Sequence, residues 1–130
     1  MRLILILFLS IHVGAAWAGN AVQHNHYWAN VMHIVDGDTF DVNVENWPDQ
    51  VVKARIRLLR VDAPEKRAAC EDERIMSRRA AARTKQLIGN KSVRLVVFGR
   101  DSFNRILAIA YTTGGLNLGR TLLDEEIAYP

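Results

Sequence analysis

The chain has 130 residues, a net charge of +3 and one cysteine. This length gives room for one domain, and a domain of this size buries enough surface to fold without cross-links. A single cysteine cannot form an internal disulfide, which excludes the disulfide-rich class of small secreted proteins. The mild basic excess is compatible with a phosphate-bearing partner but does not identify one.

The first 18 residues have the features of a secretory signal peptide. Arg2 provides a positive start, residues 3–13 form an apolar run, and the small-x-small triplet at 16–18 is typical of a cleavage site. The apolar run is short for a membrane span, so a membrane anchor is the less favoured alternative. We therefore expect a secreted or periplasmic protein, cut after Ala18, that meets a membrane only transiently through this segment.

Residues 19–29 show no clear period and are predicted to be a flexible lead-in to one domain at 30–130. His24 and His26 lie in this lead-in and His33 follows it. Because no Cys or acidic residue stands at ligand spacing from them, we interpret them as polar residues of a terminal segment rather than as metal ligands.

After the lead-in, apolar and polar residues alternate, which predicts strands over 31–35 and 40–44. Asp36 and Gly37 lie between these strands, and Asp-Gly in that position is the strongest local signal for a hairpin. The hairpin does not explain Asp38, because Asp is depleted in strands. The stretch HIVDGDTFDV therefore predicts either a plain turn or one wall of a metal site.

Five further elements follow from periodicity and turn residues. They are a strand over 51–62 with a basic outer face (Lys53, Arg55, Arg57), a helix over 71–88, strands over 91–98 and 105–113, and a helix over 117–127. Three strands, a helix, two strands and a helix do not alternate as a parallel α/β sheet requires. The order favours a mainly β fold with helices (α+β), a five-stranded, partly open barrel of the OB type, whose exposed face commonly binds oligonucleotides.

The helix over 71–88 is predicted to bury one face, formed by Met76, Ala80, Thr84, Leu87 and Ile88. Cys70 precedes this helix, between alanines and an acidic cluster. Because no spacing ties the thiol to a particular histidine, we predict that it is a buried small apolar residue rather than a nucleophile.

Two further clusters of polar residues could carry chemistry, and each has an ordinary structural explanation. Asp62 and Glu65 follow the third strand in RVDAPE, where they could simply begin a helix. Asp101 and Arg105 lie in GRDSFNRILA, where a loop ion pair is most often a surface contact. Each cluster alone is therefore weak support for a function.

Taken together, Asp-Gly-Asp-Thr, Arg-x-x-x-Val-Asp-x-Pro-Glu and Asp-x-x-x-Arg, in this order and on these elements, resemble the staphylococcal nuclease family. The resemblance covers about residues 31–129 and also implies the OB-type barrel. It implies a Ca²⁺ ion held by the carboxylates of Asp38 and Asp62 and by the backbone carbonyl of Ala63, with Asp36 close to the metal. Hard oxygen ligands of this kind suit calcium.

The resemblance also implies catalytic roles for Arg57, Arg105 and Glu65. The two arginines would hold the scissile phosphate, because a guanidinium fork binds two oxygens as negative charge builds up there. Glu65 would activate or orient the attacking water. The implied activity is an exported, calcium-dependent hydrolysis of DNA and RNA, preferably single-stranded, to 3′-phosphate ends, with no obligate protein partner.

The chain departs from the family at several positions. Phe103 and Asn104 stand where the family usually has Tyr and Gly; Phe103 lacks the hydroxyl expected to touch a phosphate, whereas Asn104 adopts the left-handed conformation readily. Ala63 stands where Thr is common, and a carbonyl ligand survives that change. Glu126 stands at a frequent Gly, and Tyr129 corresponds to an aromatic residue beside the bound base.

Two other functions stay open at this point. One is a nucleic-acid-binding module that keeps the barrel and has lost turnover. The presence of all five implied side chains favours the enzyme over this module: Asp38, Arg57, Asp62, Glu65 and Arg105. The other is a small exported scaffold whose carboxylates only form turns, which requires the ordered match of three motifs to be accidental.

Overall fold

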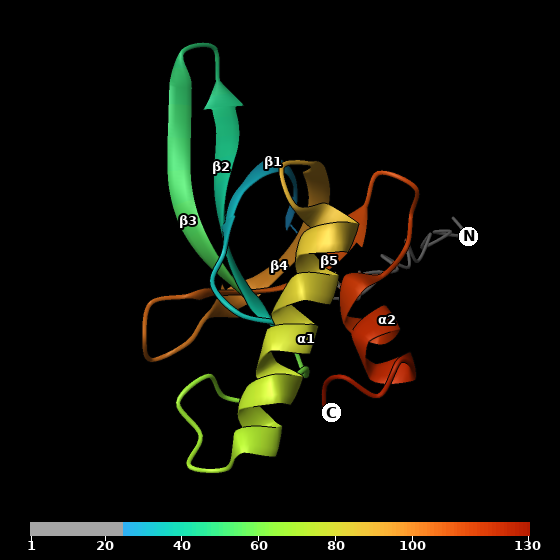
Figure 1. The fold of residues 1–130 in the computed structure, drawn as a ribbon. Helices are drawn as coiled ribbons and strands as arrows, with labels where there is room; N and C mark the ends of the chain where they lie inside the picture. The colour runs from blue at the N-terminus through green and yellow to red at the C-terminus, as the bar shows by residue number, and fades with distance from the viewer. Residues whose placement is uncertain (1–24) are drawn as a thin grey trace, which may run out of the picture.

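Five strands form a closed barrel beside two helices in the computed structural model, which describes residues 25–130 (Figure 1). The strands are β1 (Asn25–Ile34), β2 (Thr39–Trp47), β3 (Gln50–Leu58), β4 (Ser92–Arg100) and β5 (Ile106–Thr112), and the helices are α1 (Glu71–Ile88) and α2 (Leu118–Asp124). This arrangement confirms the predicted order of elements and the mainly β, OB-type barrel with helices. The barrel is closed, whereas a partly open one was predicted.

The barrel closes through its long first strand. The first part of β1 pairs with β4 and its second part with β2, and the register shifts at a bulge between Val31 and His33. β3 and β5 are parallel neighbours, with Ile56 beside Ile106, while the other neighbours are antiparallel. This order places the loop before β5 next to the basic outer face of β3.

The first strand begins earlier than predicted. The predicted flexible lead-in over 19–29 is a strand from Asn25 onward, and 25–30 pair residue by residue with β4. Most of these side chains are exposed, so backbone pairing holds the segment and no apolar period marks it in the sequence. The rest of the lead-in and the predicted signal peptide lie outside the described residues.

Within the described part of the chain, neither helix is long and apolar enough to cross a membrane.

One core joins the inner face of the barrel to the two helices. Its largest fully buried side chains include Phe40, Ile56, Leu95, Ile88 and Leu122. The predicted inner face of α1 is confirmed, because its buried residues include three of the five predicted ones and the other two, both apolar, are partly buried against the core. The helices therefore cover the end of the barrel at which the β1–β2 turn lies (Figure 1).

The third strand ends at Leu58, before the predicted boundary at 62. A turn at Leu59 and Arg60 redirects the chain, and Arg60 has a φ of 56°, in the left-handed region. Beyond this turn Asp62 pairs with Tyr129 through two backbone hydrogen bonds of 2.8 Å. The C-terminal residues therefore fix the backbone of Asp62.

Cys70 is exposed, so the prediction of a buried thiol is wrong. It stands immediately before α1 in an extended conformation, and its side chain makes no capping hydrogen bond. Most of the loop over 65–70 is exposed, so its small side chains cover no core.

The hydroxyl of Thr84 donates a 2.7 Å hydrogen bond to the carbonyl of Gly37 and so ties α1 to the β1–β2 turn. Thr84→Val keeps the shape and leaves this buried carbonyl unpaired, so we expect the free energy of unfolding to fall by about 1–3 kcal/mol in urea titrations. Thr113→Val, at an exposed position, is the control, with an expected change below about 0.5 kcal/mol. Equal effects of the two substitutions would show that the hydrogen bond does not hold the turn.

Candidate active site

The β1–β2 turn is held in one shape by its own hydrogen bonds. The amides of Val35 and Asp36 both donate to the carbonyl of Thr39, at 3.0 and 3.1 Å. The amide of Asp38 donates to the Asp36 carboxylate at 3.3 Å. This confirms the predicted hairpin, and it places Asp38 at the start of β2 beside the end of β3, where the Leu58 amide donates to its carbonyl at 2.9 Å.

Gly37 is required in this turn by a close approach. A Cβ atom built on Gly37 would lie 2.7 Å from the Cβ of Ala80 on α1 and 2.8 Å from the Cβ of Ala63. Any side chain would therefore push the turn away from the helix. The Asp-Gly-Asp pattern thus reflects both the turn and the helix packed behind it.

The Asp38 carboxylate is buried and is bonded through both oxygens. Its Oδ1 accepts from the hydroxyl of Thr39 at 2.8 Å, and its Oδ2 accepts from the amide of Ala63 at 2.6 Å. Nη1 of Arg57 lies 3.4 Å from the same Oδ2. Burial raises the pKa of Asp38 above its ordinary value, the Ala63 amide opposes this rise, and the neighbouring Asp36 adds to it. Further positive charge at this point would favour the ionised form.

Arg57 brings the two predicted metal-ligating carboxylates together. Its guanidinium pairs with Asp62 as well as with Asp38, and it donates to the carbonyl of Leu58 at 2.9 Å and to that of Val61. The Arg57 side chain is only 15% exposed, whereas the Asp62 side chain is 69% exposed. Two carboxylates far apart in the sequence therefore meet one cation, one from inside the protein and one from the solvent side.

Carboxylate and carbonyl oxygens are the ligand type that a hard divalent cation such as Ca²⁺ prefers. Asp36 lies close enough to Asp38 to raise its pKa, and Asp62 pairs with the same guanidinium as Asp38. The carbonyl of Ala63 accepts no hydrogen bond within residues 25–130. The same residues contain no group of three or more His, Cys, Asp or Glu side chains placed to hold a metal. A cation here would thus be held by two carboxylates, a carbonyl and water, which calcium tolerates.

Glu65 and Arg105 lie outside this cluster. The Glu65 side chain is exposed and makes no hydrogen bond or ion pair with any other described residue. Arg105 precedes β5, and its Nε donates to Asp101 at 2.7 Å. Its terminal nitrogens form no hydrogen bond within 25–130. Arg57 is in register with Leu107 of the neighbouring parallel strand β5. Arg105 lies two residues before Leu107 and therefore on the same outer face as Arg57.

The loop before β5 is organised by the Asp101 carboxylate. One carboxylate oxygen accepts the amides of Phe103 and Arg105, each at 2.9 Å. Although burial raises the pKa of Asp101, the hydrogen bonds from Arg105 and Phe103 outweigh it and hold this pKa below its usual value. Asn104 has a φ of 62°, which confirms the left-handed turn expected of it. Phe103 is 79% exposed, and its ring centre lies 5.4 Å from the guanidinium carbon of Arg105.

The C-terminal departures are also placed by the structure. Glu126 has a φ of 56°, a conformation that favours glycine and explains why glycine suits this position. Tyr129 is exposed, and its backbone pairs with Asp62. Its side chain is therefore available at the edge of the site, and its role beside a base stays a prediction.

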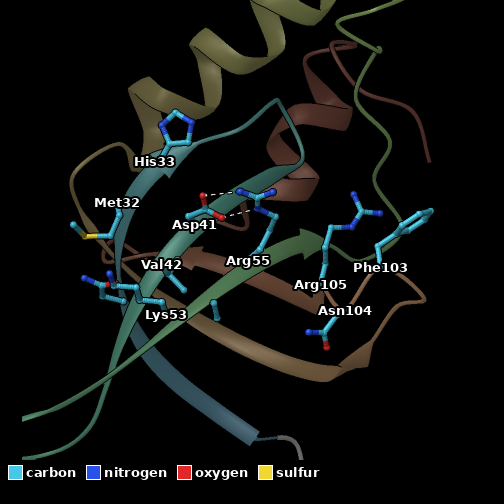
Figure 2. A pocket seen from close by; sticks show the side chains of 11 residues that line it. Met32, His33, Asp41, Val42, Lys53, Arg55, Phe103, Asn104 and Arg105 are labelled. Carbon is cyan, nitrogen blue, oxygen red and sulfur yellow. Dashed lines mark hydrogen bonds and ion pairs between the residues drawn. The ribbon is translucent and has the colours of Figure 1, made fainter.

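A groove of about 600 Å³ lies on the outer face of the same strands (Figure 2). Lys53 and Arg55 of β3 line it together with His33, Asp41 and Arg105. The sequence predicted a basic outer face but assigned no function to Lys53 or Arg55. The alternation of β3 already places Lys53 and Arg55 on the same face as Arg57. Which residues of the neighbouring strands they contact depends on the strand register, which the sequence alone does not give.

Comparisons with known proteins show which family the sequence resembles. A family model described as staphylococcal nuclease homologue matches residues 55–129. An uncharacterized endonuclease of Escherichia coli is 32% identical over 99 residues, and one of Escherichia coli O157:H7 is 31% identical over 99 residues. Each match covers 76% of this chain and 58% of the relative, so the chain spans somewhat more than half the length of these curated relatives.

Substitutions of Asp38 separate its structural role from its charge. Without added metal, Asp38→Ala leaves the Ala63 amide and Arg57 without their buried acceptor, so we expect a loss of about 2 kcal/mol in the free energy of unfolding. Asp38→Asn keeps an acceptor and removes a buried charge, with an expected loss below about 1 kcal/mol. Asp62→Ala, at the exposed partner, is the control, also below about 1 kcal/mol. Urea unfolding measures all three, and equal losses for Asp38→Ala and Asp62→Ala would contradict this assignment.

Proposed function

Because the chain belongs to the staphylococcal nuclease homologue family, we propose that it is a calcium-dependent nuclease that hydrolyses phosphodiester bonds of DNA and RNA to 3′-phosphate ends. The observation that best supports this proposal is the meeting of Asp38 and Asp62 at the guanidinium of Arg57. Single-stranded nucleic acid is the preferred substrate, because the site must reach one backbone. No obligate protein partner is part of the proposal.

Asp38, Asp62 and the carbonyl of Ala63 would hold the Ca²⁺ ion. When bound, the ion supplies positive charge that polarises a phosphoryl oxygen and lowers the pKa of a bound water. The Asp38 carboxylate accepts hydrogen bonds from the Thr39 hydroxyl and the Ala63 amide, which fix its position without a metal ion. The exposed Asp62 carboxylate is fixed only through its contact with Arg57 and through the backbone pairing of its residue.

Arg57 and Arg105 would bind the scissile phosphate. Negative charge builds up on the non-bridging oxygens during attack, and each planar guanidinium can donate two hydrogen bonds to them. Asp101 accepts a hydrogen bond from Nε of Arg105, so the two terminal nitrogens remain available for a phosphate. Arg57 is anchored to the carbonyl of Leu58, so it can exchange Asp62 for a phosphate without leaving the end of β3.

Glu65 would accept a proton from the attacking water. The water oxygen forms a bond to phosphorus, the bond from phosphorus to the 5′ oxygen breaks, and the leaving oxygen takes a proton from solvent. The products are a 3′-phosphate and a 5′-hydroxyl. Because the Glu65 carboxylate is exposed and has no partner among the described residues, it is available for this role.

Export to the periplasm or the medium is part of the proposal. It rests on the sequence of residues 1–18, with their positive start, apolar run and small-x-small triplet. Calcium is abundant outside the cytoplasm, which suits a site built from few carboxylates and water.

Calcium and Glu65 are tested together. We expect the purified protein to cleave single-stranded DNA with Ca²⁺ and to stop with a chelator. Glu65→Gln is expected to lower kcat at least about 100-fold while leaving urea unfolding unchanged, because it removes the proton acceptor from an exposed position. Glu73→Gln, at another exposed carboxylate, is the control and should retain full activity.

The outcomes of this assay separate the candidate functions. Cleavage that persists in chelator, or at full rate in Glu65→Gln, would refute the mechanism. Binding of DNA without cleavage by the unmutated protein would favour the alternative, a nucleic-acid-binding module with weak or no turnover.

Arg105→Lys tests the need for a guanidinium fork. Lysine keeps the charge but cannot donate two parallel hydrogen bonds, so kcat should fall by about 100-fold with a smaller change in KM. Arg120→Lys, at an exposed arginine on α2 held by Asp124, is the matched control. A normal kcat in Arg105→Lys would remove Arg105 from the mechanism.

A further inference from the structure

The groove beside the candidate active site contains cations that the proposed mechanism does not use. Lys53 and Arg55 project from β3 on the outer face that also carries Arg57. Alternate residues of a strand are about 6.7 Å apart, so these three side chains form an evenly spaced row of positive charge. The row ends at the carboxylates of the candidate active site.

Arg55 and Arg105 line one hollow together. Parallel pairing of Ile56 with Ile106 makes Arg55 and Arg105 neighbours across β3 and β5. Together with Phe103 they line a space of about 310 Å³ that continues the groove. Figure 2 shows Arg55 between Asp41 and Arg105, with Phe103 beyond Arg105. Two guanidiniums beside an exposed aromatic ring are groups that bind a phosphate and stack on its base.

Asp41 holds Arg55 in place across the face. Nε and Nη2 of Arg55 donate to the two carboxylate oxygens of Asp41 at 2.7 and 3.0 Å. The hydrogen bonds from Arg55 lower the pKa of Asp41, so this carboxylate stays ionised. The Arg55 side chain is 52% exposed, and exposed pairs contribute little stability. Arg55 can therefore exchange Asp41 for a phosphate at small cost.

We propose that Arg55 and Lys53 form a second phosphate-binding subsite, which binds the substrate strand beside the scissile phosphate, with Asp41 as an internal competitor. This rests on the proposed function, since the strand is the proposed nucleic acid substrate. Three cations line the groove against one carboxylate, Asp41, which favours a polyanion. The subsite sets affinity for longer strands and takes no part in the bond-breaking step.

Binding of a fluorescent single strand of about ten nucleotides, in chelator and at several salt concentrations, tests the subsite. Arg55→Gln should weaken binding about tenfold and lower the slope of log K against log salt by about 0.7, the value for one lost phosphate contact. Arg120→Gln is the matched control, because Arg120 is also exposed and is also held by an aspartate through Nε. It should change neither quantity.

Asp41→Asn gives the opposite sign. Removing the competitor frees Arg55 and removes a negative charge, so binding should tighten and the salt slope should steepen. If the Arg55 pair with Asp41 served only the fold, both substitutions would weaken binding or leave it unchanged. Urea unfolding of both variants checks that the barrel is intact.

Cleavage assays distinguish failure of this subsite from failure of the proposed function. One outcome is that the unmutated protein cleaves the strand with Ca²⁺ and that Arg55→Gln binds the strand as tightly as the unmutated protein. This outcome would overturn the subsite and leave the nuclease. Arg55-dependent binding without cleavage would keep the subsite and overturn the nuclease. If the unmutated protein neither binds nor cleaves the strand, both are overturned. Where both hold, Arg55→Gln should lower kcat/KM for the long strand and not for a dinucleotide.

Discussion

The buried Asp38 carboxylate holds the candidate active site together. It joins Thr39 in its own strand to the amide of Ala63, which follows β3, and it faces Arg57. A buried carboxylate is costly unless it is paired and hydrogen-bonded, so Asp38 is stable in this position only while those partners stay in place. The same contacts fix the residues that would hold a metal and a phosphate. The proposed chemistry and the stability of this end of the barrel therefore depend on one set of hydrogen bonds.

Helix α1 supports Asp38 from behind. Its Ala80 leaves no room for a side chain at Gly37, and its Thr84 donates to the Gly37 carbonyl. The turn is thus pressed against a helix that is itself anchored in the core by Ile88. Close packing and this hydrogen bond restrict movement of the turn relative to the helix. The helix contributes precision to the site although none of its residues carries the proposed chemistry.

The sequence predicted those features that carry a local signal. Alternation and the Asp-Gly pair predicted the hairpin, and helical spacing predicted α1 with its boundaries at 71 and 88. The first half of β1 was not predicted, because its side chains are exposed and only backbone pairing with β4 defines it. The early end of β3 was also missed, because Arg60 takes a left-handed conformation that no glycine or asparagine marks.

The resemblance named candidate site residues but could not give the contacts among them. Three ordered motifs implied Asp38, Arg57 and Asp62, but only the folded chain shows that Arg57 lies between the two carboxylates. The pairing of Arg55 with Asp41 depends on the register of β2 against β3, which alternation alone leaves undetermined. Residue types can thus be inferred from a resemblance, whereas partners have to be read from the strand register.

Arg57 and Arg55 show how one strand divides two tasks. Each arginine projects from β3 toward an aspartate that belongs to β2 or to the turn before it. The Arg57 pair is buried, and breaking a buried pair leaves an uncompensated charge, so Arg57 is held in place. The Arg55 pair is exposed and exchanges its partner at little cost. Burial therefore decreases along β3 from the carboxylate cluster to the groove. The guanidinium of Arg57 is fixed where the phosphodiester bond would break, whereas that of Arg55 is free to bind the nucleic acid beside it.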